Sequence, residues 1–410
     1  MSNHEGGADG SRRAEIADLT ERLVAIPSHE DETAAGDAIE RWLRAETDAD
    51  VERDEAGSVL AYKGAVDDPD ATSLALIGHH DVVPPADRQV RAVGAADTDG
   101  GDAAATDAGD DAADESEDGG EGPAEYVVER RDGRIYGRGS ADMKGAVAAA
   151  MVAFRDATPP EGRELVFASF VGEEIGGTGA RHAIDQGFVP DHAVIAEGST
   201  NYSKEGVTDV VVAHKGRRGS TLVAEGVAAH ASEPEAGENA VYRACDAVDV
   251  VRDLDAPETE VFGETVSGSV AVTGIDGGET WNVIPERCDV IIDERTVPGE
   301  RADLGRAESI PGVEWTVDQD LPPMGCTDAA FADAALDAAR EVHAALGLDA
   351  PEHVTKPHAT DAGWLAEAGT ACLVCGASEP GEAHTKTESV SIDVLDRCHR
   401  IYAGIAERSW

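Results

Sequence analysis

Polar side chains that could bind metal ions or move protons follow short apolar runs and glycine-rich turns at several points of the chain. They are His79 and Asp81 in GHHDVVP, Asp142 in GRGSADMKG, Glu173 and Glu174 in VGEEIGG, Glu197 in AEGS, and His384 in EAHTKTE. Imidazoles combined with carboxylates are the ligand types that zinc, cobalt and manganese accept in proteins. Each residue alone would be weak evidence, because a polar group at a strand end is commonly structural, so the set carries the prediction.

This set of side chains would suit a site that binds two divalent metal ions. Such a pair needs a carboxylate that bridges the ions, an imidazole and a carboxylate on each ion, and a shared water between metals about 3.5–4 Å apart. We expect Asp142 to bridge the ions. His79 and Glu197 would complete one site, while Glu174 and His384 would complete the other. Two ions held in this way lower the pKa of the water and polarise a carbonyl, so an amide could be cleaved without a side-chain nucleophile.

Two further acids have the positions that orienting and proton-transfer groups require. Asp81 lies two residues after His79, so on a strand both side chains point to the same face and the carboxylate can fix the orientation of the imidazole. Glu173 directly precedes the expected ligand Glu174 and is free to act as general base and then as general acid. A surface role for Glu173 is the alternative in so acidic a chain, but the adjacent ligand favours catalysis.

The elements that must position these residues follow an alternating pattern of apolar strands and helices. Three apolar runs, in SLALIGHH, LVFASFVGEE and HAVIAEG, end on candidate ligands. This is typical of an α/β sheet whose ligands collect at the carboxyl ends of its strands. After about residue 215 the pattern changes to strands that alternate polar and apolar residues, with one helix among them. We therefore predict an α/β catalytic domain, residues 1–214 and 318–410, with a smaller α+β domain, residues 215–317, inserted into it.

Composition excludes several classes of partner. The 33 Lys and Arg residues against 83 Asp and Glu give a net charge of -50, which opposes binding to nucleic acid. The excess of acids is instead typical of adaptation to a salt-rich cytoplasm, because at about 1 M salt the Debye length falls to roughly 3 Å. No apolar run is long enough for a secretory signal or a membrane span, so we expect a cytoplasmic protein without membrane contact. Its six cysteines are scattered, which favours reduced and buried thiols.

An acidic insertion of about residues 91–125 interrupts the catalytic domain. It consists largely of Ala, Gly, Asp and Glu, with no Lys or Arg between Ala92 and Ala124. Such a composition predicts a solvated, disordered loop rather than a metal-collecting segment.

The motifs together resemble a known family. GHHDVVP, GRGSADMKG, the GEE motif, AEGS and the late AH segment, with LVAIPS near the start, occur in the order found in succinyl-diaminopimelate desuccinylases, acetylornithine deacetylases, aminoacylases and related carboxypeptidases. The resemblance implies two divalent metal ions with the roles assigned above, zinc first and cobalt or manganese as alternatives. It also implies a mixed-sheet catalytic domain, an inserted dimerisation or lid domain, a homodimer, and a cis peptide after Asp142.

The same resemblance implies functions for residues of the inserted domain. His230, in GVAAHASEPEAGENAV, matches a histidine that reaches a neighbouring subunit's active site and donates a hydrogen bond to the developing oxyanion. Asn282 and Arg295, in WNVIPERCDVIIDERTVPGE, match residues that bind the substrate's carboxylate.

Weaker matches extend the predicted substrate site. Arg217 and Arg218 in KGRRGS are similar to a segment of desuccinylases in which an arginine contacts the substrate. Thr360 in PHATDAG is expected to line the pocket. The family often has a Trp and a Pro-Phe pair where this chain has the acidic insertion, which leaves the pocket rim undefined.

The motifs are compatible with several functions. The favoured one is hydrolysis of an N-acyl amino acid, of the succinyl-diaminopimelate type first, with acetylornithine deacetylation or cleavage of dipeptides and peptide carboxyl ends as alternatives. A non-catalytic metal-binding homologue would not require Glu173 and Asp81. A nucleophile-based hydrolase is disfavoured because no GxSxG elbow and no Cys/His signature are present.

Overall fold

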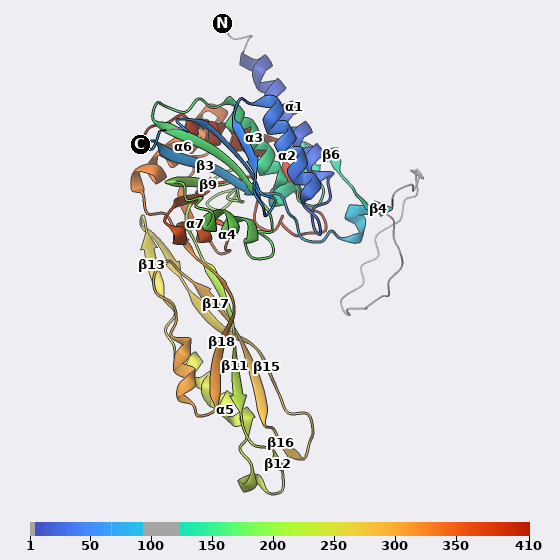
Figure 1. Cartoon of the computed structure of the whole chain (residues 1–410), viewed down its shortest axis with the longest axis vertical. Coiled ribbons are helices and arrows are strands. Elements are labelled where there is room, and N and C mark those ends of the chain that lie inside the picture. The colour runs from blue at the N-terminus through green and yellow to red at the C-terminus, as the bar shows by residue number, and fades with distance from the viewer. Residues whose placement is uncertain (1–4, 67, 93–123) are drawn as a thin grey trace.

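The computed structural model describes residues 5–66, 68–92 and 124–410. Figure 1 shows a rounded upper unit that contains both ends of the described chain and an elongated lower unit that extends away from it. The chain passes from the upper to the lower unit between β10 (Val210–His214) and β11 (Gly216–Glu225), and returns between β18 (Val313–Leu321) and β19 (Met324–Gly325).

The upper unit is built on a large mixed sheet. Its strands run in the order β1-β2-β8-β3-β9-β21-β10-β19, and β20 also pairs with β10. Besides β10 and β19, these strands are β1 (Asp50–Arg53), β2 (Val59–Gly64), β3 (Thr72–His79), β8 (Arg163–Phe170), β9 (His192–Ile195), β20 (His353–Lys356) and β21 (Ala371–Val374). The middle strands β8, β3, β9 and β21 are mutually parallel, while β1, β2 and β19 pair antiparallel. The predicted mixed α/β class is confirmed.

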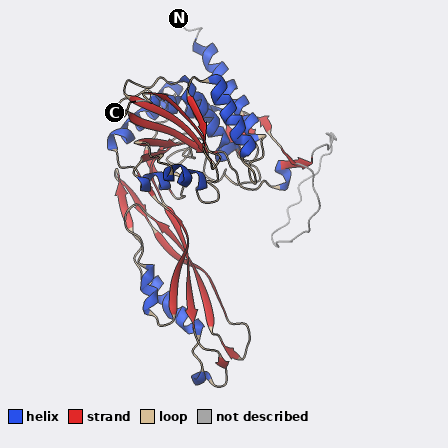
Figure 2. Cartoon of the chain, in the orientation of Figure 1, coloured by secondary structure: helices blue, strands red, loops and turns tan. Residues whose placement is uncertain are grey.

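Helices cover both faces of this sheet, as Figure 2 shows in blue. Successive residues of a strand face opposite sides, so Leu74 and Leu76 of β3 pack into one core and Ala75 and Ile77 into the other. This explains why the parallel strands are apolar throughout. The first core is closed by α1 (Glu5–Val24), α2 (Thr33–Glu46), α3 (Gly145–Asp156), α6 (Ala329–Leu346) and α8 (Ile392–Ala406), and the second by α4 (Thr178–Asp185) and α7 (Ala362–Ala368).

The segment before α3 has irregular backbone. Residues Ser140–Lys144 form a distorted turn in which Asp142 and Met143 have non-helical φ and ψ angles. The turn begins after Gly139, whose φ of 82° is left-handed and whose added Cβ would lie 2.5 Å from Val82 Cγ1. The expected cis peptide between Asp142 and Met143 is present.

The lower unit has its own antiparallel sheet with the order β15-β17-β11-β18. It combines β11 and β18 with β15 (Ser269–Gly277) and β17 (Arg287–Thr296). Helix α5 (Ala240–Arg252) and the 3-10 helix η4 (Leu304–Ser309) pack on one face and form a separate apolar core. At the far tip β12 (Ala229–His230) pairs with β16 (Val283–Ile284), next to the 3-10 helix η3 (Pro234–Ala236). The hairpin of β13 (Glu258–Val261) and β14 (Glu264–Ser267) lies at the end nearer the upper unit.

The expected end of the inserted domain at residue 317 falls inside β18. This strand remains paired with β11 as far as Leu321. Pro322 and Pro323 follow it, and proline cannot continue a strand ladder because it lacks the N–H group. The lower sheet therefore ends at these prolines, and the division into domains otherwise stays a prediction.

The remaining strands lie beside the upper unit. They are β4 (Val90–Ala92), β5 (Ala124–Tyr126), β6 (Glu129–Arg131), β7 (Arg134–Tyr136) and β22 (Ser389–Ser391), and the 3-10 helix η1 (Asp87–Gln89) precedes β4. Strands β4 and β5 pair antiparallel and bracket the acidic insertion, whose interior lies outside the described residues. Within the part of the chain that the structure describes, no helix is both long and apolar enough to cross a membrane. Five of the six cysteines are buried free thiols as predicted, but Cys245 is exposed.

Candidate metal centre

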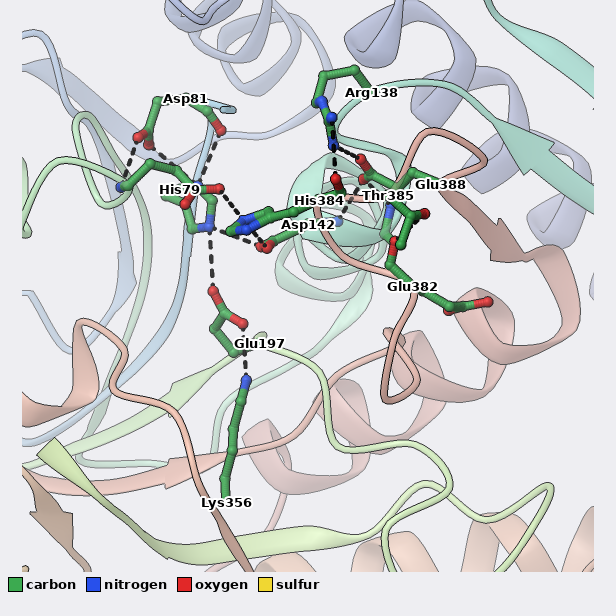
Figure 3. A network of polar contacts seen from close by, with 12 residues as sticks. His79, Asp81, Arg138, Asp142, Glu197, Lys356, Glu382, His384, Thr385 and Glu388 are labelled. Atoms are coloured by element: carbon green, nitrogen blue, oxygen red, sulfur yellow. Dashed lines mark hydrogen bonds and ion pairs between the residues drawn. The ribbon is translucent and has the colours of Figure 1, made fainter. Parts of the chain in front are cut away.

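The parallel strands deliver the predicted ligands to one edge of the large sheet. His79 is the last residue of β3, Glu174 follows the end of β8, and Glu197 follows the end of β9. Because β8, β3 and β9 run parallel and side by side, their carboxyl ends meet at the same edge. Asp142 joins them from the irregular turn before α3, and His384 from the loop between β21 and β22 (Figure 3).

Asp142 lies between the two imidazoles. Its Oδ1 atom is 3.3 Å from His79 Nε2, and its Oδ2 atom is 3.1 Å from His384 Nε2. His79 Nε2 is also 3.2 Å from Glu197 Oε1, and His384 Nε2 is 3.0 Å from Glu174 Oε1. Each imidazole therefore meets one oxygen of the same central carboxylate and one further carboxylate. This donor set fits two divalent ions that share Asp142.

Burial and crowding shift the pKa values at this centre. Burial raises the pKa of Glu173 well above its ordinary value, and nearby carboxylates add to the rise although the charge of His79 opposes it. Burial also raises the pKa of Asp361 to about 7. For His79, burial acts to lower the pKa, but the surrounding carboxylates, Asp81 first, outweigh it and hold the pKa well above its usual value. Divalent cations would neutralise the acids that are concentrated here.

Asp81 contacts both an imidazole and the loop that carries a ligand. Its Oδ1 atom is 3.2 Å from His79 Nδ1, and its backbone oxygen is 3.1 Å from the same nitrogen. Its Oδ2 atom accepts a hydrogen bond of 3.0 Å from the backbone N–H of Glu174. Asp81 is thus placed to orient His79 and, through the backbone, Glu174.

Glu173 lines the space next to these ligands. One cavity of about 330 Å³ is lined by Glu173, Glu197 and His384, together with Tyr202 and Lys356. Another, of about 300 Å³, is lined by Glu173 and His384 as well, and also by Arg217, Thr360 and Asp361. Glu173 offers an oxygen within 4.8 Å of ligand atoms of His79 and Glu197. The geometry therefore puts it beside the centre and open to a substrate.

Lys356 is a member of this site that the sequence did not reveal. Its Nζ atom is 3.0 Å from Glu197 Oε2, on the side of the carboxylate that faces away from His79. Burial acts to lower the pKa of Lys356, but the charge of Glu197 outweighs it and the pKa lies above its usual value. Lys356 therefore stays charged at neutral pH. The signal in the sequence is a single lysine at the end of a short strand in a chain with few cations.

Of the predicted substrate residues, Thr360 and Arg217 lie near the centre. Both line the 300 Å³ cavity. Thr360 Oγ1 is 3.2 Å from His214 Nε2, and Arg217 Nε donates a hydrogen bond of 2.8 Å to Asp293 Oδ2. Arg295 donates to the other oxygen of Asp293 at 2.7 Å.

The structure does not bring Arg218 to the site. Neighbouring residues of a strand face opposite sides, so Arg218 points to the covered face of the lower sheet while Arg217 points to the open one. There Arg218 Nε donates to Glu294 Oε2 at 2.5 Å, and its Nη2 donates to the backbone oxygen of Ala302 at 2.8 Å. Its guanidinium is thus occupied by contacts inside the lower unit.

His230 and Asn282 lie at the far tip of the lower unit, away from the metal centre of the same chain (Figure 1). They are neighbours there, since the backbone oxygen of Asn282 accepts a hydrogen bond of 2.9 Å from Ala231 N, the residue after His230. Neither residue lies at the metal centre of its own chain, and the role of His230 at a neighbouring subunit's centre stays a prediction.

The sequence also matches the model of a known protein family. Residues 75–408 match the model of peptidase family M20/M25/M40. The chain belongs to this family. Like other members of peptidase family M20/M25/M40, it is an enzyme that acts on amide bonds, as the sequence predicted.

Relatives within peptidase family M20/M25/M40 include two kinds of deacylase. The chain is 29% identical over 298 residues to acetylornithine deacetylase of Myxococcus xanthus, a match that covers 67% of this chain and 73% of the relative. It is 27% identical over 301 residues to succinyl-diaminopimelate desuccinylase of Hahella chejuensis, which covers 69% of this chain and 76% of the relative.

Solved structures share the fold at lower identity. Aminopeptidase PepT of Bacillus cereus superposes with a TM-score of 0.71 at 16% identity, covering 96% of this chain and 97% of that one. The YxeP protein of Bacillus subtilis is described as a dinuclear metal-binding peptidase of the M20 family. It superposes with a TM-score of 0.65 at 16% identity, and the match covers 97% of this chain and 98% of the YxeP chain. These likenesses support the mixed α/β architecture.

Proposed function

We propose that this enzyme uses two divalent metal ions to remove the acyl group from an N-acyl amino acid. The observation that supports this most directly is the position of Asp142, with one oxygen toward each of the two imidazoles. His79 and Glu197 would hold one ion, and Glu174 and His384 the other. Zinc is the first candidate because the ligands are imidazoles and carboxylates, with cobalt and manganese as alternatives.

The chain's own residues would move the proton. Bound metal ions supply activation of a water and polarisation of the amide carbonyl. Glu173, beside the ligands, would accept the water's proton and donate it to the leaving amine. Its position beside the ligands, on the lining of both cavities, suits this pair of roles. Asp81 would hold the orientation of His79 throughout.

For the substrate, we favour an N-succinyl amino acid of the succinyl-diaminopimelate type. Arg217 lines a cavity beside Glu173, and if its guanidinium turned from Asp293 to a substrate it could donate two parallel hydrogen bonds to a carboxylate. Relatives are named succinyl-diaminopimelate desuccinylase, acetylornithine deacetylase and probable carboxypeptidase. Acetylornithine deacetylation and cleavage of dipeptides or peptide carboxyl ends are therefore the alternative activities.

We also propose that the working form is a homodimer. His230 and Asn282 cannot serve the centre of their own chain from the far tip of the lower unit, so they would reach a partner's centre. Exposed apolar side chains of the lower unit, Ile275, Trp281 and Ile291, favour an interface there. The cytoplasmic location and the salt-rich setting stay predictions from composition.

The test compares substrates and metal content in parallel. The purified chain would be assayed in high salt with N-succinyl, N-acetyl and dipeptide substrates, after dialysis against chelator and again after addition of zinc, cobalt or manganese. We expect binding of two metal ions per chain and metal-dependent release of the amine, fastest from the N-succinyl substrate. Full activity after removal of all metal, or binding of fewer than two ions, would contradict the proposal.

A further inference from the structure

A buried ion pair connects the two chain segments that carry Asp142 and His384. Arg138 follows β7 and Glu388 immediately precedes β22, and these two strands pair antiparallel. Arg138 Nη1 is 2.6 Å from Glu388 Oε2, and both side chains are shielded, with exposed fractions of 4% and 0%. The pair thus crosses the junction between segments that are 250 residues apart in the sequence.

Each member of the pair contacts the backbone of the other segment at the ligand itself. Glu388 Oε1 accepts hydrogen bonds from the backbone N–H groups of Ala141, at 3.0 Å, and Asp142, at 3.1 Å. Arg138 Nη2 reaches the backbone oxygen of His384 at 3.5 Å. Figure 3 shows the pair beside the two ligands, above and to the right of Asp142 and His384. Glu388, which lies four residues after His384, therefore holds the backbone of Asp142. Arg138, which lies four residues before Asp142, contacts the backbone of His384.

The irregular backbone around Asp142 explains why an acceptor is needed. Asp142 has φ of -127° and ψ of 91°, so its N–H group does not join the helical hydrogen bonds of α3. A buried N–H group without a partner is costly, and Glu388 supplies that partner. A neutral amide oxygen would accept these N–H groups more weakly, and only a carboxylate can accept them and also pair with Arg138.

Stability alone does not account for the pair. Desolvation of a buried ion pair can cost as much as the attraction between the charges gains, and an apolar replacement is often no less stable. The backbones of the two segments already pair through β7 and β22, and the ion pair adds a connection at the two ligands themselves. His384 has a φ of 62°, a conformation that is uncommon for residues other than glycine.

We propose that Arg138 and Glu388 are positioning residues that set the spacing of Asp142 and His384 before metal ions bind. The proposal rests on the two-metal function above. His79 and Glu197 follow neighbouring strands of the large sheet and have that support without the pair. Loss of the pair should therefore weaken the ion that would be held by Glu174 and His384 more than the ion on the side of His79.

The test replaces Glu388 by glutamine and measures metal binding directly. Affinity would be measured in high salt by competition with a chromophoric chelator on the full chain, and metal content by elemental analysis. Residues behind metal ligands typically contribute about 10- to 100-fold in affinity. We expect Glu388→Gln to weaken one of two bound ions by about that factor, with a smaller effect on the other.

Glu294→Gln is the matched control. Glu294 is also buried, accepts a hydrogen bond from an arginine, Arg218, on Oε2, and accepts a backbone N–H, that of Ala302, on Oε1 at 2.8 Å. It lies in the lower unit away from the metal centre. Glu294→Gln should leave both metal affinities within about twofold of the parent, although it removes the same kind of contact. Equal affinities in the parent and in Glu388→Gln would overturn the proposal.

A second variant covers the case in which Glu388→Gln does not fold. Arg138→Gln combined with Glu388→Gln leaves no unpaired buried charge, so it avoids the main penalty of the single change. It should fold and still bind one ion weakly, and two ions bound as in the parent would refute the positioning role. If the parent itself binds fewer than two ions, the two-metal function fails instead, so the two failures are distinguishable.

Discussion

Replacement of Lys356 by methionine should affect the metal-free protein far more than the metal-loaded protein. Lys356 Nζ is 3.0 Å from Glu197 Oε2, and both side chains are largely buried, with exposed fractions of 7% and 12%. Two unit charges at that distance attract by about 5.5 kcal/mol at an effective permittivity of about 20. Desolvation of the ammonium offsets part of this, so the free energy of unfolding should fall by about 3 kcal/mol without metal.

With metal bound, Lys356→Met should lower the free energy of unfolding by less, because the metal ion then pairs with Glu197 in place of the lysine. If this decrease is about 1 kcal/mol, metal binding stabilises the variant by about 2 kcal/mol more than it stabilises the parent. By linkage this corresponds to metal binding that is about 30-fold tighter. Denaturant unfolding in high salt, with and without chelator, measures the first effect, and chelator competition measures the second.

Lys204→Met is the matched control, since Lys204 pairs with Asp349 at 2.6 Å but is 62% exposed. Exposed pairs contribute about 0–1 kcal/mol, so this variant should match the parent closely in both states. The reasoning is refuted if Lys356→Met destabilises the metal-free chain no more than Lys204→Met does. An equal loss with and without metal would also refute it.

Glu173→Gln should lower kcat by about 10²- to 10⁴-fold with two metal ions still bound, and a loss below tenfold in a fully loaded enzyme would argue against a proton-transfer role. Of the six cysteines only Cys245 is exposed, and burial raises the pKa of Cys398 to about 12. At mildly alkaline pH one thiol of the native protein should therefore react with a disulfide reagent, and all six thiols should react in denaturant. More than one fast native thiol would contradict this. Lowering salt from about 1 M to about 0.1 M lengthens the Debye length from roughly 3 to roughly 10 Å, so the melting temperature should fall, and an unchanged value would exclude salt adaptation.

The sequence predicted those parts of the site that depend on local sequence patterns. An apolar run that ends on polar residues marks a buried strand and its carboxyl end, which is how His79 and Glu197 could be assigned to one edge of a sheet. The predicted end of the inserted domain at residue 317 did not use Pro322 and Pro323, which follow the last paired residue of β18, Leu321.

Contacts between distant segments could not be predicted in the same way. Lys356 lies 159 residues from Glu197 and Glu388 lies 250 residues from Arg138, so no local spacing links either pair. Glu388 is the final residue of the segment EAHTKTE that also contains His384, yet only the fold shows which backbone it contacts. Arg217 and Arg218 were predicted together, but neighbours on a strand cannot both face one cavity, and which of them does depends on the register of β11.

The pairing of β4 with β5 holds the two ends of the region between them together, so this region should tolerate replacement by another polypeptide segment. Ala92 and Ala124 are cross-strand partners, so the upper unit presents two chain ends that are already side by side. Doubling the length of a loop with fixed ends costs only about 0.6 kcal/mol in closure entropy. A linker, an affinity tag or a small folded reporter could therefore replace the acidic stretch here, and the enzyme could be immobilised or labelled through it.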